Sequence, residues 1–194
     1  MTKKHSITVF LLLISIGITS CTDYLPKPKA YPRIYYPQRT YSKTDTDCPF
    51  SFDIPSYSKL EQYTDGNEPC WYNLTYPQFN ATLHLSYIPI TGINDLDSLT
   101  EDAYKMAFTP HIQRAEEIIE RGISDTTKGI RGMIYDLQGK TATPFNFYIT
   151  DEKKHYIRGA FYFNQKTTRD SVMPIYDFIN EDIMRSIQSF GFED

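Results

Sequence analysis

The sequence predicts an α+β fold, in which an antiparallel sheet of about six strands packs against two amphipathic helices. Three observations lead to this prediction: strand-forming segments occur in two blocks, a helical segment separates the blocks, and a second helical segment closes the chain. Strands grouped in this way pair with their chain neighbours through short turns, which favours antiparallel pairing. We expect one domain over residues 33–194, because a chain of this length supports a single core.

The first block contains four strand-forming segments, residues 33–40, 48–54, 70–74 and 79–88. Pro37 interrupts the first segment, and proline is tolerated at the edge of a sheet, so we expect an edge strand there. The last segment alternates most regularly, as a strand does when one face is buried. Its apolar face carries Phe79, Ala81, Leu83, Leu85 and Tyr87, and its polar face carries Asn80, Thr82, His84 and Ser86.

The helical segment that follows starts with Ser98-Leu99-Thr100-Glu101, which has the form of a capping box. Apolar residues then recur near the 3.6-residue period of an α-helix as far as Gly122, a residue type that often ends helices. Pro110 lies inside this segment and should kink or split the helix, because proline removes one backbone hydrogen bond. The apolar positions are Ala103, Met106, Ala107, Ile112, Ala115, Ile118 and Ile119.

The second block contains three strand-forming runs, residues 129–137, 143–150 and 156–164, which short polar turns connect into an antiparallel meander. The chain closes with a second helix, which we expect to start at about Pro174, since proline suits the first helical turn. Gly191 ends it. The predicted buried face of this helix carries Ile175, Phe178, Ile179, Ile183 and Ile187.

The N-terminal 20 residues have the form of a bacterial signal peptide. Lys3 and Lys4 precede an apolar run over residues 7–18, which is too short to span a bilayer comfortably. The run ends in Ile18-Thr19-Ser20-Cys21, which has the form of a lipobox. We therefore predict cleavage between Ser20 and Cys21 and lipidation of the Cys21 thiol. The alternatives are an ordinary secretory signal with a chance cysteine and, less favoured because polar residues follow at once, a single-pass anchor.

Lipidation of Cys21 would anchor the mature chain to a membrane, because two or more palmitate-like acyl chains hold a protein there stably. Residues 21–32 would then form a Pro-rich tether, extended in a polyproline-like geometry, and an alternative role for them is a docking segment. Removal of Lys3 and Lys4 takes the net charge of the chain from −4 to −6. A mildly acidic domain of this kind does not bind nucleic acid or anionic lipid non-specifically.

Cys48 and Cys70 are the cysteines left after Cys21 is assigned to lipid. In an oxidising compartment they predict one disulfide, and the alternatives are two free thiols or half of a metal site. The metal site is the least favoured of these, because the histidines show no ligand-like spacing. We therefore predict no metal and no cofactor.

The sequence lacks the motifs that are typical of enzymes, among them a nucleophile elbow, a phosphate loop and a dinucleotide-binding glycine pattern. Arg158 and Gly159 interrupt a good strand, which indicates a bulge or the close approach of another backbone. Arg158 is interpreted either as a solvated or ion-paired side chain or as a partner-binding residue. We predict that the protein is not an enzyme.

A set of short segments follows the predicted lipobox in a characteristic order and spacing. They are Pro26-Lys27-Pro28-Lys29, Cys48-Pro49-Phe50-Ser51-Phe52, Cys70-Trp71, His84-Leu85-Ser86-Tyr87, His111, Tyr148-Ile149-Thr150-Asp151, Arg158-Gly159-Ala160-Phe161-Tyr162-Phe163 and Asp170-Ser171-Val172. Together these segments resemble the gliding motility-associated lipoprotein GldD family of Bacteroidetes, and Ala30 and Asn146 depart mildly from the family pattern. The resemblance implies a component required for surface gliding and linked to type IX secretion, with other cell-envelope lipoproteins as partners and no catalytic residues to carry over.

Two functional hypotheses follow. The first is an interaction or assembly lipoprotein, anchored in the outer membrane and facing the periplasm, since residues 22–25 lack the acidic run associated with surface export. The second is a periplasmic ligand-binding protein or enzyme with a sheet pocket around His84, Tyr87, His111 and Arg158. The candidate interaction residues are Trp71, His84, Tyr87, His111 and Arg158.

Overall fold

The computed structural model describes residues 31–65, 68–92, 95–139, 141, 143–167 and 169–193. The chain divides into two units, residues 1–34 and 35–194, and the fold described here is that of the second unit. The predicted signal peptide, Cys21 and residues 22–30 of the predicted tether lie outside the described residues. Within the described ranges, no helix is long and apolar enough to cross a membrane.

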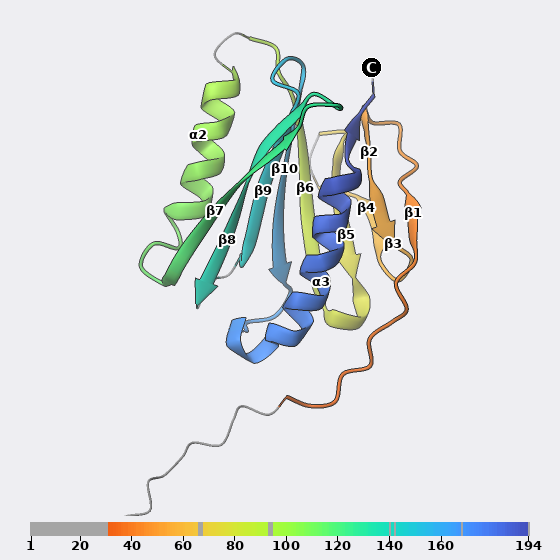
Figure 1. Ribbon diagram of the computed structural model, residues 1–194, viewed down its shortest axis with the longest axis vertical. Coiled ribbons are helices and arrows are strands. Elements are labelled where there is room, and N and C mark those ends of the chain that lie inside the picture. Colours follow the sequence, from red (N-terminus) through yellow and green to blue (C-terminus); the bar gives the residue numbers. More distant parts are fainter. Residues whose placement is uncertain are drawn as a thin grey trace, which may run out of the picture. The chain divides into compact units, whose positions relative to one another are not determined.

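A seven-stranded sheet, antiparallel throughout, forms the centre of this unit (Figure 1). It confirms the predicted α+β class and agrees roughly with the expected six strands. The second block of strands forms the predicted meander, and the first block joins it where β6 pairs with β10. The strand order is β4 (Lys59–Gln62), β5 (Trp71–Tyr76), β6 (Ala81–Pro89), β10 (His155–Phe163), β9 (Phe145–Thr150), β8 (Ile130–Gly139) and β7 (Ala115–Asp125).

Four short strands form two further ladders beside the main sheet. β1 (Tyr41–Lys43) pairs with β3 (Asp53–Pro55), and β2 (Phe50–Ser51) pairs with β11 (Gly191–Phe192). The second ladder brings a segment early in the domain against its C-terminal end. A short 3₁₀ helix, η1 (Pro77–Phe79), connects β5 to β6.

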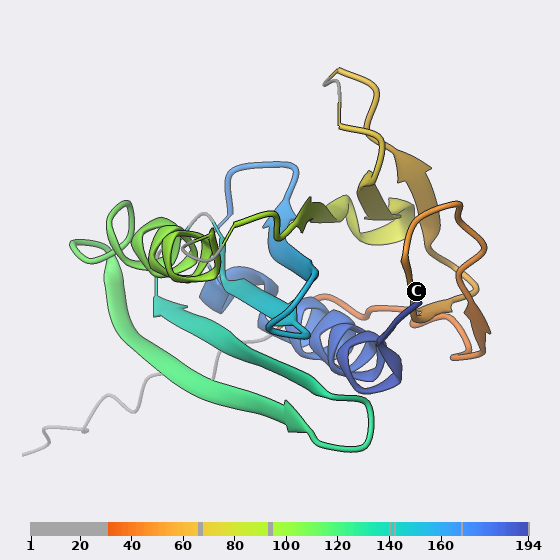
Figure 2. The same ribbon diagram turned by 90° about the horizontal axis from the view of Figure 1, so that it is seen from above.

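The two helices lie on opposite faces of the sheet. Figure 2 shows α3 (Arg169–Ser189) on one side and α2 (Asp95–Phe108) on the other. We call these the α3 face and the α2 face. The main core lies on the α3 face, and alternation along each strand assigns its buried members to that face. They include Leu74, Leu83, Ile134, Phe147, Ile149 and Phe161 from the sheet and Ile179, Ile183 and Ile187 from the helix.

Several sequence predictions hold in detail. On β6, Ala81, Leu83 and Leu85 are buried on one face as expected. On α3, Ile179, Ile183 and Ile187 are buried as expected, but the helix starts at Arg169 and not at Pro174. Pro174 therefore lies in the second helical turn, where its missing N–H removes one backbone hydrogen bond.

The prediction of a helix through to Gly122 is wrong. α2 ends at Phe108, residues 109–114 form turns, and β7 follows as a regular strand paired along β8. Ile118 and Ile119 match the helical period, but in the structure they lie on a strand and point to its two different faces. Ile118 is paired with Leu137 of β8, and Ile119 with Asp136. β-Branched residues such as isoleucine suit a strand, and pairing with β8 satisfies the backbone groups that the helix would have satisfied.

Two smaller predictions also need correction, and one strand was not predicted. Residues 33–40 have no regular structure, and the first strand begins at Tyr41. Ser98 does not cap α2 but lies within it, since the helix begins at Asp95, whose carboxylate accepts hydrogen bonds from the N–H groups of Thr91 and Gly92. The sequence did not predict β4.

Gly159 introduces no bulge, because the pairing of β10 with both of its neighbours is continuous. The ring of Phe147 covers it instead, so that a Cβ on Gly159 would lie 2.2 Å from Phe147 Cε1. The close approach expected at Gly159 is therefore made by a side chain, and the bulge is absent.

Candidate functional site

The α2 face of the sheet is only partly covered. Helix α2 packs on β8 and β9, where Ala107 is buried with Tyr135 and Leu137. Beyond it, the α2 face of β10, β6 and β5 carries half-buried side chains of a mixed aromatic and polar kind, together with the buried side chains of Thr82, Ser86 and Tyr156. The members used below are Trp71, Asn73, His84, Arg158 and Tyr162. We call this surface the open face.

His84 lies at the centre of the open face. Its Nδ1 lies 2.7 Å from Asn73 Oδ1 on the neighbouring strand, and a carbonyl oxygen can only accept, so Nδ1 carries the proton. The Nε2 atom is then an acceptor. The imidazole makes an edge contact with the ring of Tyr162, at 5.2 Å between centroids. Burial lowers the pKa of His84, which favours a neutral side chain at this position.

Trp71 lies at the edge of the open face, where β5 begins. Its indole Nε1–H donates to the backbone carbonyl of Tyr87 at 3.1 Å. Its ring lies 6.2 Å from that of Tyr63. Half-buried and anchored by this bond, Trp71 presents an amphipathic ring at the margin of the surface.

A pocket of about 210 Å³ lies where α2 meets the open face. We call it the α2 pocket. Its apolar lining includes Ala103, Met106 and Pro110 from α2 and the turn after it, and Ala160 from β10. Its polar lining includes His111, Thr143, Asn146, Arg158 and Tyr162.

The turn after α2 places His111 in the wall of this pocket. His111 Nε2 and Thr143 Oγ1 lie 2.6 Å apart, and both side chains are buried. Burial lowers the pKa of His111, and the nearby positive charge of Arg114 lowers it further. The pair therefore supplies neutral hydrogen-bonding groups to the pocket.

Arg158 points from the middle of β10 into the same pocket. Its side chain is half-buried, and its Nη1 contacts the thioether sulfur of Met106. Over the described residues, no carboxylate lies within ion-pairing distance of its guanidinium. A guanidinium carries five N–H donors, and a thioether is a weak acceptor, so most of its hydrogen-bonding capacity remains for solvent or a ligand.

Four of the five predicted interaction residues lie on the α2 side of the sheet, and the fifth, Tyr87, does not. Trp71, His84 and Arg158 share the open face, and His111 joins Arg158 in the α2 pocket. Tyr87 lies on the α3 face, where its hydroxyl lies 2.7 Å from His155 Nδ1. A single pocket formed by His84, Tyr87, His111 and Arg158 is thus not present. His84 and Tyr87 lie three positions apart on β6, so their side chains point to opposite faces of the sheet.

Sequence reasoning missed several members of this site. Tyr162 was detectable, because alternation along β10 places it on the same face as Arg158. Thr143 and Met106 were not, since only the tertiary packing of the turn and of α2 brings them to the pocket. In chemical terms the arrangement offers aromatic surfaces, neutral hydrogen-bonding groups and one cation. Among the described residues, no three His, Cys, Asp or Glu side chains are grouped to hold a metal ion.

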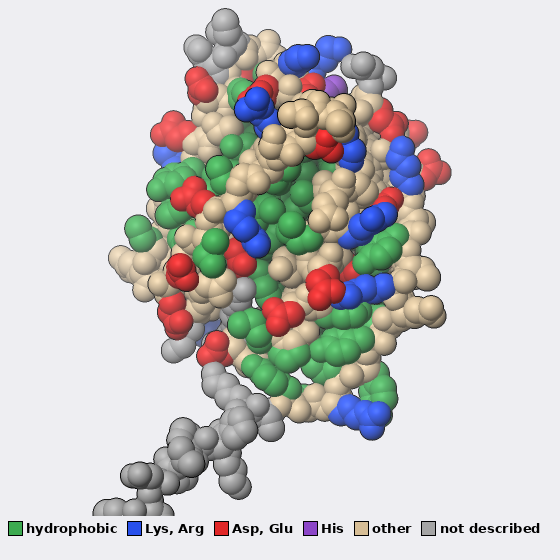
Figure 3. All heavy atoms as spheres, in the orientation of Figure 1, with side chains coloured by type: hydrophobic (Ala, Val, Ile, Leu, Met, Phe, Trp, Pro, Cys, Tyr) green, Lys and Arg blue, Asp and Glu red, His purple; other side chains and the backbone are tan. Residues whose placement is uncertain are grey.

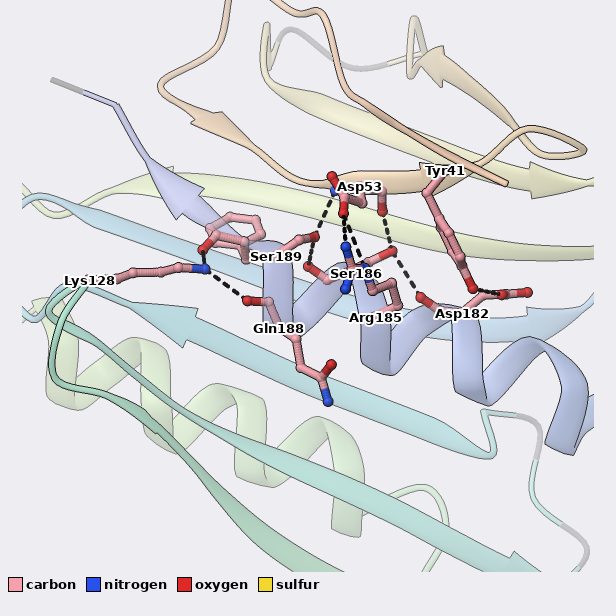
Figure 4. Close-up of polar contacts among 9 residues, drawn as sticks. Tyr41, Asp53, Lys128, Asp182, Arg185, Ser186, Gln188 and Ser189 are labelled. Carbon is pink, nitrogen blue, oxygen red and sulfur yellow. Dashed lines mark hydrogen bonds and ion pairs between the residues drawn. The ribbon is translucent and has the colours of Figure 1, made fainter. Parts of the chain in front are cut away.

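A second polar cluster lies on the other side of the molecule, where the N-terminal part of the domain packs on α3 (Figure 4). The Asp182 carboxylate is fully buried and accepts hydrogen bonds from the hydroxyls of Tyr41, at 2.6 Å, and Tyr57. Arg39 Nε lies 3.2 Å from the same carboxylate. Burial and the bond to Asp182 raise the pKa of Tyr41 to about 12.

The same cluster continues along the helix. Ser186 Oγ donates to the carbonyl of Asp53 at 2.7 Å, and Arg185 Nη2 lies 2.8 Å from the Asp53 carboxylate. At the helix end, Lys128 Nζ donates to the carbonyls of Gln188 and Phe190 at 2.8 and 2.9 Å. These contacts hold β3 and the β7–β8 turn against α3, so we interpret the cluster as structural.

A groove of about 410 Å³ lies between the β7–β8 hairpin and α3. Figure 3 shows hydrophobic side chains gathered there between charged ones. Its apolar lining is Ile123, Ile130, Ile134, Met184, Ile187 and Phe190.

Comparison with known proteins gives one family. The family of the gliding motility lipoprotein GldD matches the chain over residues 21–192. No curated protein matches it. Among solved structures, the solution structure of cyanobacterial PsbP (CyanoP) from Synechocystis sp. PCC 6803 is similar, with 13% sequence identity and a TM-score of 0.45. That comparison covers 91% of this chain and 99% of the other.

Proposed function

Because the chain belongs to the GldD family of gliding motility lipoproteins, we propose that it acts by protein–protein interaction, as a lipid-anchored component of the gliding apparatus in the cell envelope. Its partners are other envelope lipoproteins of that apparatus, which is linked to type IX secretion. The open face is the surface through which it binds them.

The observation that supports this proposal is that the open face groups a tryptophan, a tyrosine and an arginine on one side of the sheet. Trp71, Tyr162 and Arg158 belong to the three residue types that most often dominate binding energy at protein interfaces. Here they lie half-buried on one side of the sheet, and neighbouring groups hold Trp71 and Tyr162, so that these two rings lose little side-chain entropy on binding. An interface needs such fixed aromatic anchors surrounded by satisfied polar groups, and the His84–Asn73 pair supplies one such group.

Anchoring follows from the N-terminal sequence. The family match begins at Cys21, the residue that the lipobox marks for acylation. We propose that Cys21 carries the lipid, that residues 21–32 form the tether, and that the domain faces the periplasm from the outer membrane. Cys21→Ser should move the protein from the membrane fraction to the soluble periplasmic fraction. Retention of the variant in the membrane fraction would contradict lipid anchoring.

The interaction itself is tested by cross-linking of the full-length protein in native membranes, followed by affinity capture and mass spectrometry. We expect recurrent cross-links to envelope lipoproteins, with the linked residues concentrated on β5, β6 and β10. Repeated capture of the protein without any envelope component would count against the interaction role.

A further inference from the structure

We propose that the α2 pocket binds a carboxylate carried beside a small apolar group, and that this carboxylate is the C-terminal residue of a partner protein. The inference deepens the proposed function, on which it rests, by naming the chemistry of one contact. Three features of the pocket support it: the position of Arg158, the neutral polar groups, and the apolar residues in the same lining.

The positive charge of Arg158 favours a negatively charged ligand in the pocket. Among the described residues that line it, Arg158 is the one charged side chain, and none of the described carboxylates pairs with it. A half-buried guanidinium binds carboxylates through two parallel hydrogen bonds, which are stronger than bonds between neutral groups. Met106 Sδ, the sulfur that Arg158 contacts, is a weak acceptor that a carboxylate oxygen would readily displace.

The neutral polar groups can complete the recognition of an anion. Thr143 and His111 line the pocket as a buried pair, and Asn146 and Tyr162 add an amide and a phenol. Ligand sites commonly combine a few convergent polar groups of this kind with an apolar wall. The arrangement is thus suited to hold both oxygens of one carboxylate.

The apolar lining residues and the size of the pocket indicate what kind of group accompanies the carboxylate. Ala103, Met106 and Pro110, from α2 and the turn after it, are apolar lining residues that an aliphatic group can contact, and Ala160 adds a small apolar residue beside Arg158 on β10. At about 210 Å³ the pocket is smaller than the roughly 300–1,000 Å³ of sites for drug-sized ligands, so it accommodates about one residue. A chain end provides a carboxylate and an apolar side chain on the same residue, whereas a glutamate side chain offers no apolar group at its tip.

The pocket is also placed for a protein partner. Tyr162 belongs both to its lining and to the open face, where it contacts His84. Exposed apolar side chains continue from its rim, since Met106 is 50% exposed and Ile112 is 68% exposed. A partner lying on the open face could therefore insert its chain end into the pocket.

The test uses the full-length lipidated protein in detergent micelles, with methionine methyl groups labelled for NMR. The probes are acetyl-Gly-Gly-Leu with a free carboxyl end, the same peptide with an amide end, and 4-methylpentanoate. We expect the peptide acid to shift the Met106 methyl signal in a saturable way and to leave that of Met184, which lines the groove beside α3, in place. The amide should bind at least ten-fold more weakly.

Variants provide the controls. Arg158→Gln should weaken binding of the peptide acid at least ten-fold, and Arg158→Lys should restore part of it, because a lysine keeps the charge and loses the bidentate geometry. Arg131→Gln removes an exposed arginine of the α2 face that pairs with Glu152, and it should change nothing. Thermal unfolding of each variant shows whether it is folded.

Equal binding of acid and amide, or unchanged binding by Arg158→Gln, would overturn the inference. Equal affinity for 4-methylpentanoate and the peptide acid would overturn the assignment to a chain end and identify a free acid as the ligand. If all probes fail while the native-membrane cross-links from β5, β6 and β10 persist, the proposed function stands and only this contact is lost.

Discussion

At the scale of single residues, the buried carboxylate of Asp182 does the most to join the N-terminal part of the domain to the rest. It receives two tyrosine hydroxyls and lies beside the guanidinium of Arg39. A buried charge is costly unless it is paired and hydrogen-bonded, so this site depends on all three partners. None of the three was predicted, because they lie more than a hundred positions from Asp182 in the sequence.

Replacement of Asp182 tests this dependence. Asp182→Ala should lower the free energy of unfolding by about 3 kcal/mol, because it leaves two tyrosine hydroxyls without their acceptor and takes away the carboxylate beside Arg39 Nε, although Arg39 keeps its contacts with Glu181 and the Phe178 carbonyl. Tyr41→Phe removes one hydrogen bond and should cost about 1 kcal/mol. Arg185→Ala, on the same helix, breaks an exposed ion pair and should cost less than about 1 kcal/mol. Urea unfolding measures all three, and a cost for Asp182→Ala no larger than that for Arg185→Ala would contradict this account.

The two histidines of the site predict a dependence of stability on pH. Burial lowers the pKa of both His84 and His111 in the folded protein, so the unfolded chain binds protons more readily. Stability should therefore be complete above about pH 6.5, the pKa of an unfolded histidine, and fall as the pH drops through that value towards the lowered folded pKa values.

The double variant His84→Asn, His111→Gln isolates this contribution. Asparagine can replace the Nδ1 bond of His84, and glutamine can replace the Nε2 bond of His111. We expect a smaller loss of unfolding free energy between pH 7.5 and pH 5.5 than in the unaltered protein, measured by urea unfolding. An equal loss in both proteins would assign the pH dependence to the carboxylates.

Gly159 tests the packing of the core on the α3 face. An added methyl group would overlap the ring of Phe147, so Gly159→Ala should cost about 1–3 kcal/mol. Gly122→Ala is the matched control, because a Cβ there meets nothing within 4 Å. Phe147→Leu should make Gly159→Ala less costly in a double-mutant cycle. Equal effects of the two glycine variants would show that the ring can move away freely.

At the scale of elements, the strands and helices that the sequence predicted are those whose apolar residues follow either the two-residue period of a strand or the 3.6-residue period of a helix, and not both. β6, the three strands of the meander and the buried stripe of α3 are of this kind. The failures are elements that tertiary pairing decides. β7 matched a helical period by coincidence, and β4 exists because it can pair with β5, although its own residues are mostly exposed.

The site was predictable to the same extent. Strand alternation correctly placed His84 on the face of β6 opposite Leu83 and Leu85, and the interruption at Arg158 drew attention to a residue that lines the α2 pocket. The α2 pocket was not predictable, because it depends on where α2 and the turn after it pack. Tyr87 was assigned to the site although its position in the alternation places it on the opposite face.

The disulfide between Cys48 and Cys70 connects the segment before β2 to the start of β5. It closes a loop with a sequence separation of 22 residues, for which the chain-entropy relation gives a stabilisation of about 3 kcal/mol. The double variant Cys48→Ser, Cys70→Ser should lower the unfolding free energy by about that amount and leave the core sheet folded. Circular dichroism and urea unfolding measure both properties. A variant as stable as the unaltered protein would show that the bond adds nothing to the packing around it.

At the scale of the whole molecule, the family assignment and the fold describe a lipoprotein domain with two unequal sides. Apart from the groove beside the β7–β8 hairpin, the α3 face is covered by a long helix, by the β1–β3 and β2–β11 ladders and by the Asp182 cluster. The α2 face is covered over β8 and β9 and open over β10, β6 and β5. This asymmetry supports the proposal that the α3 face stabilises the fold and that the open face, on the α2 side, binds partners.

Site-specific photo-cross-linking in living cells tests this division most directly. A photoreactive amino acid at Thr75, which alternation along β5 places on the open face with Trp71 and Asn73, is compared with one at Asp177, on the exposed side of α3. We predict that Thr75 gives a discrete cross-linked product with an envelope lipoprotein and that Asp177 gives none. The same product from Asp177 and none from Thr75 would contradict the assignment of the binding surface.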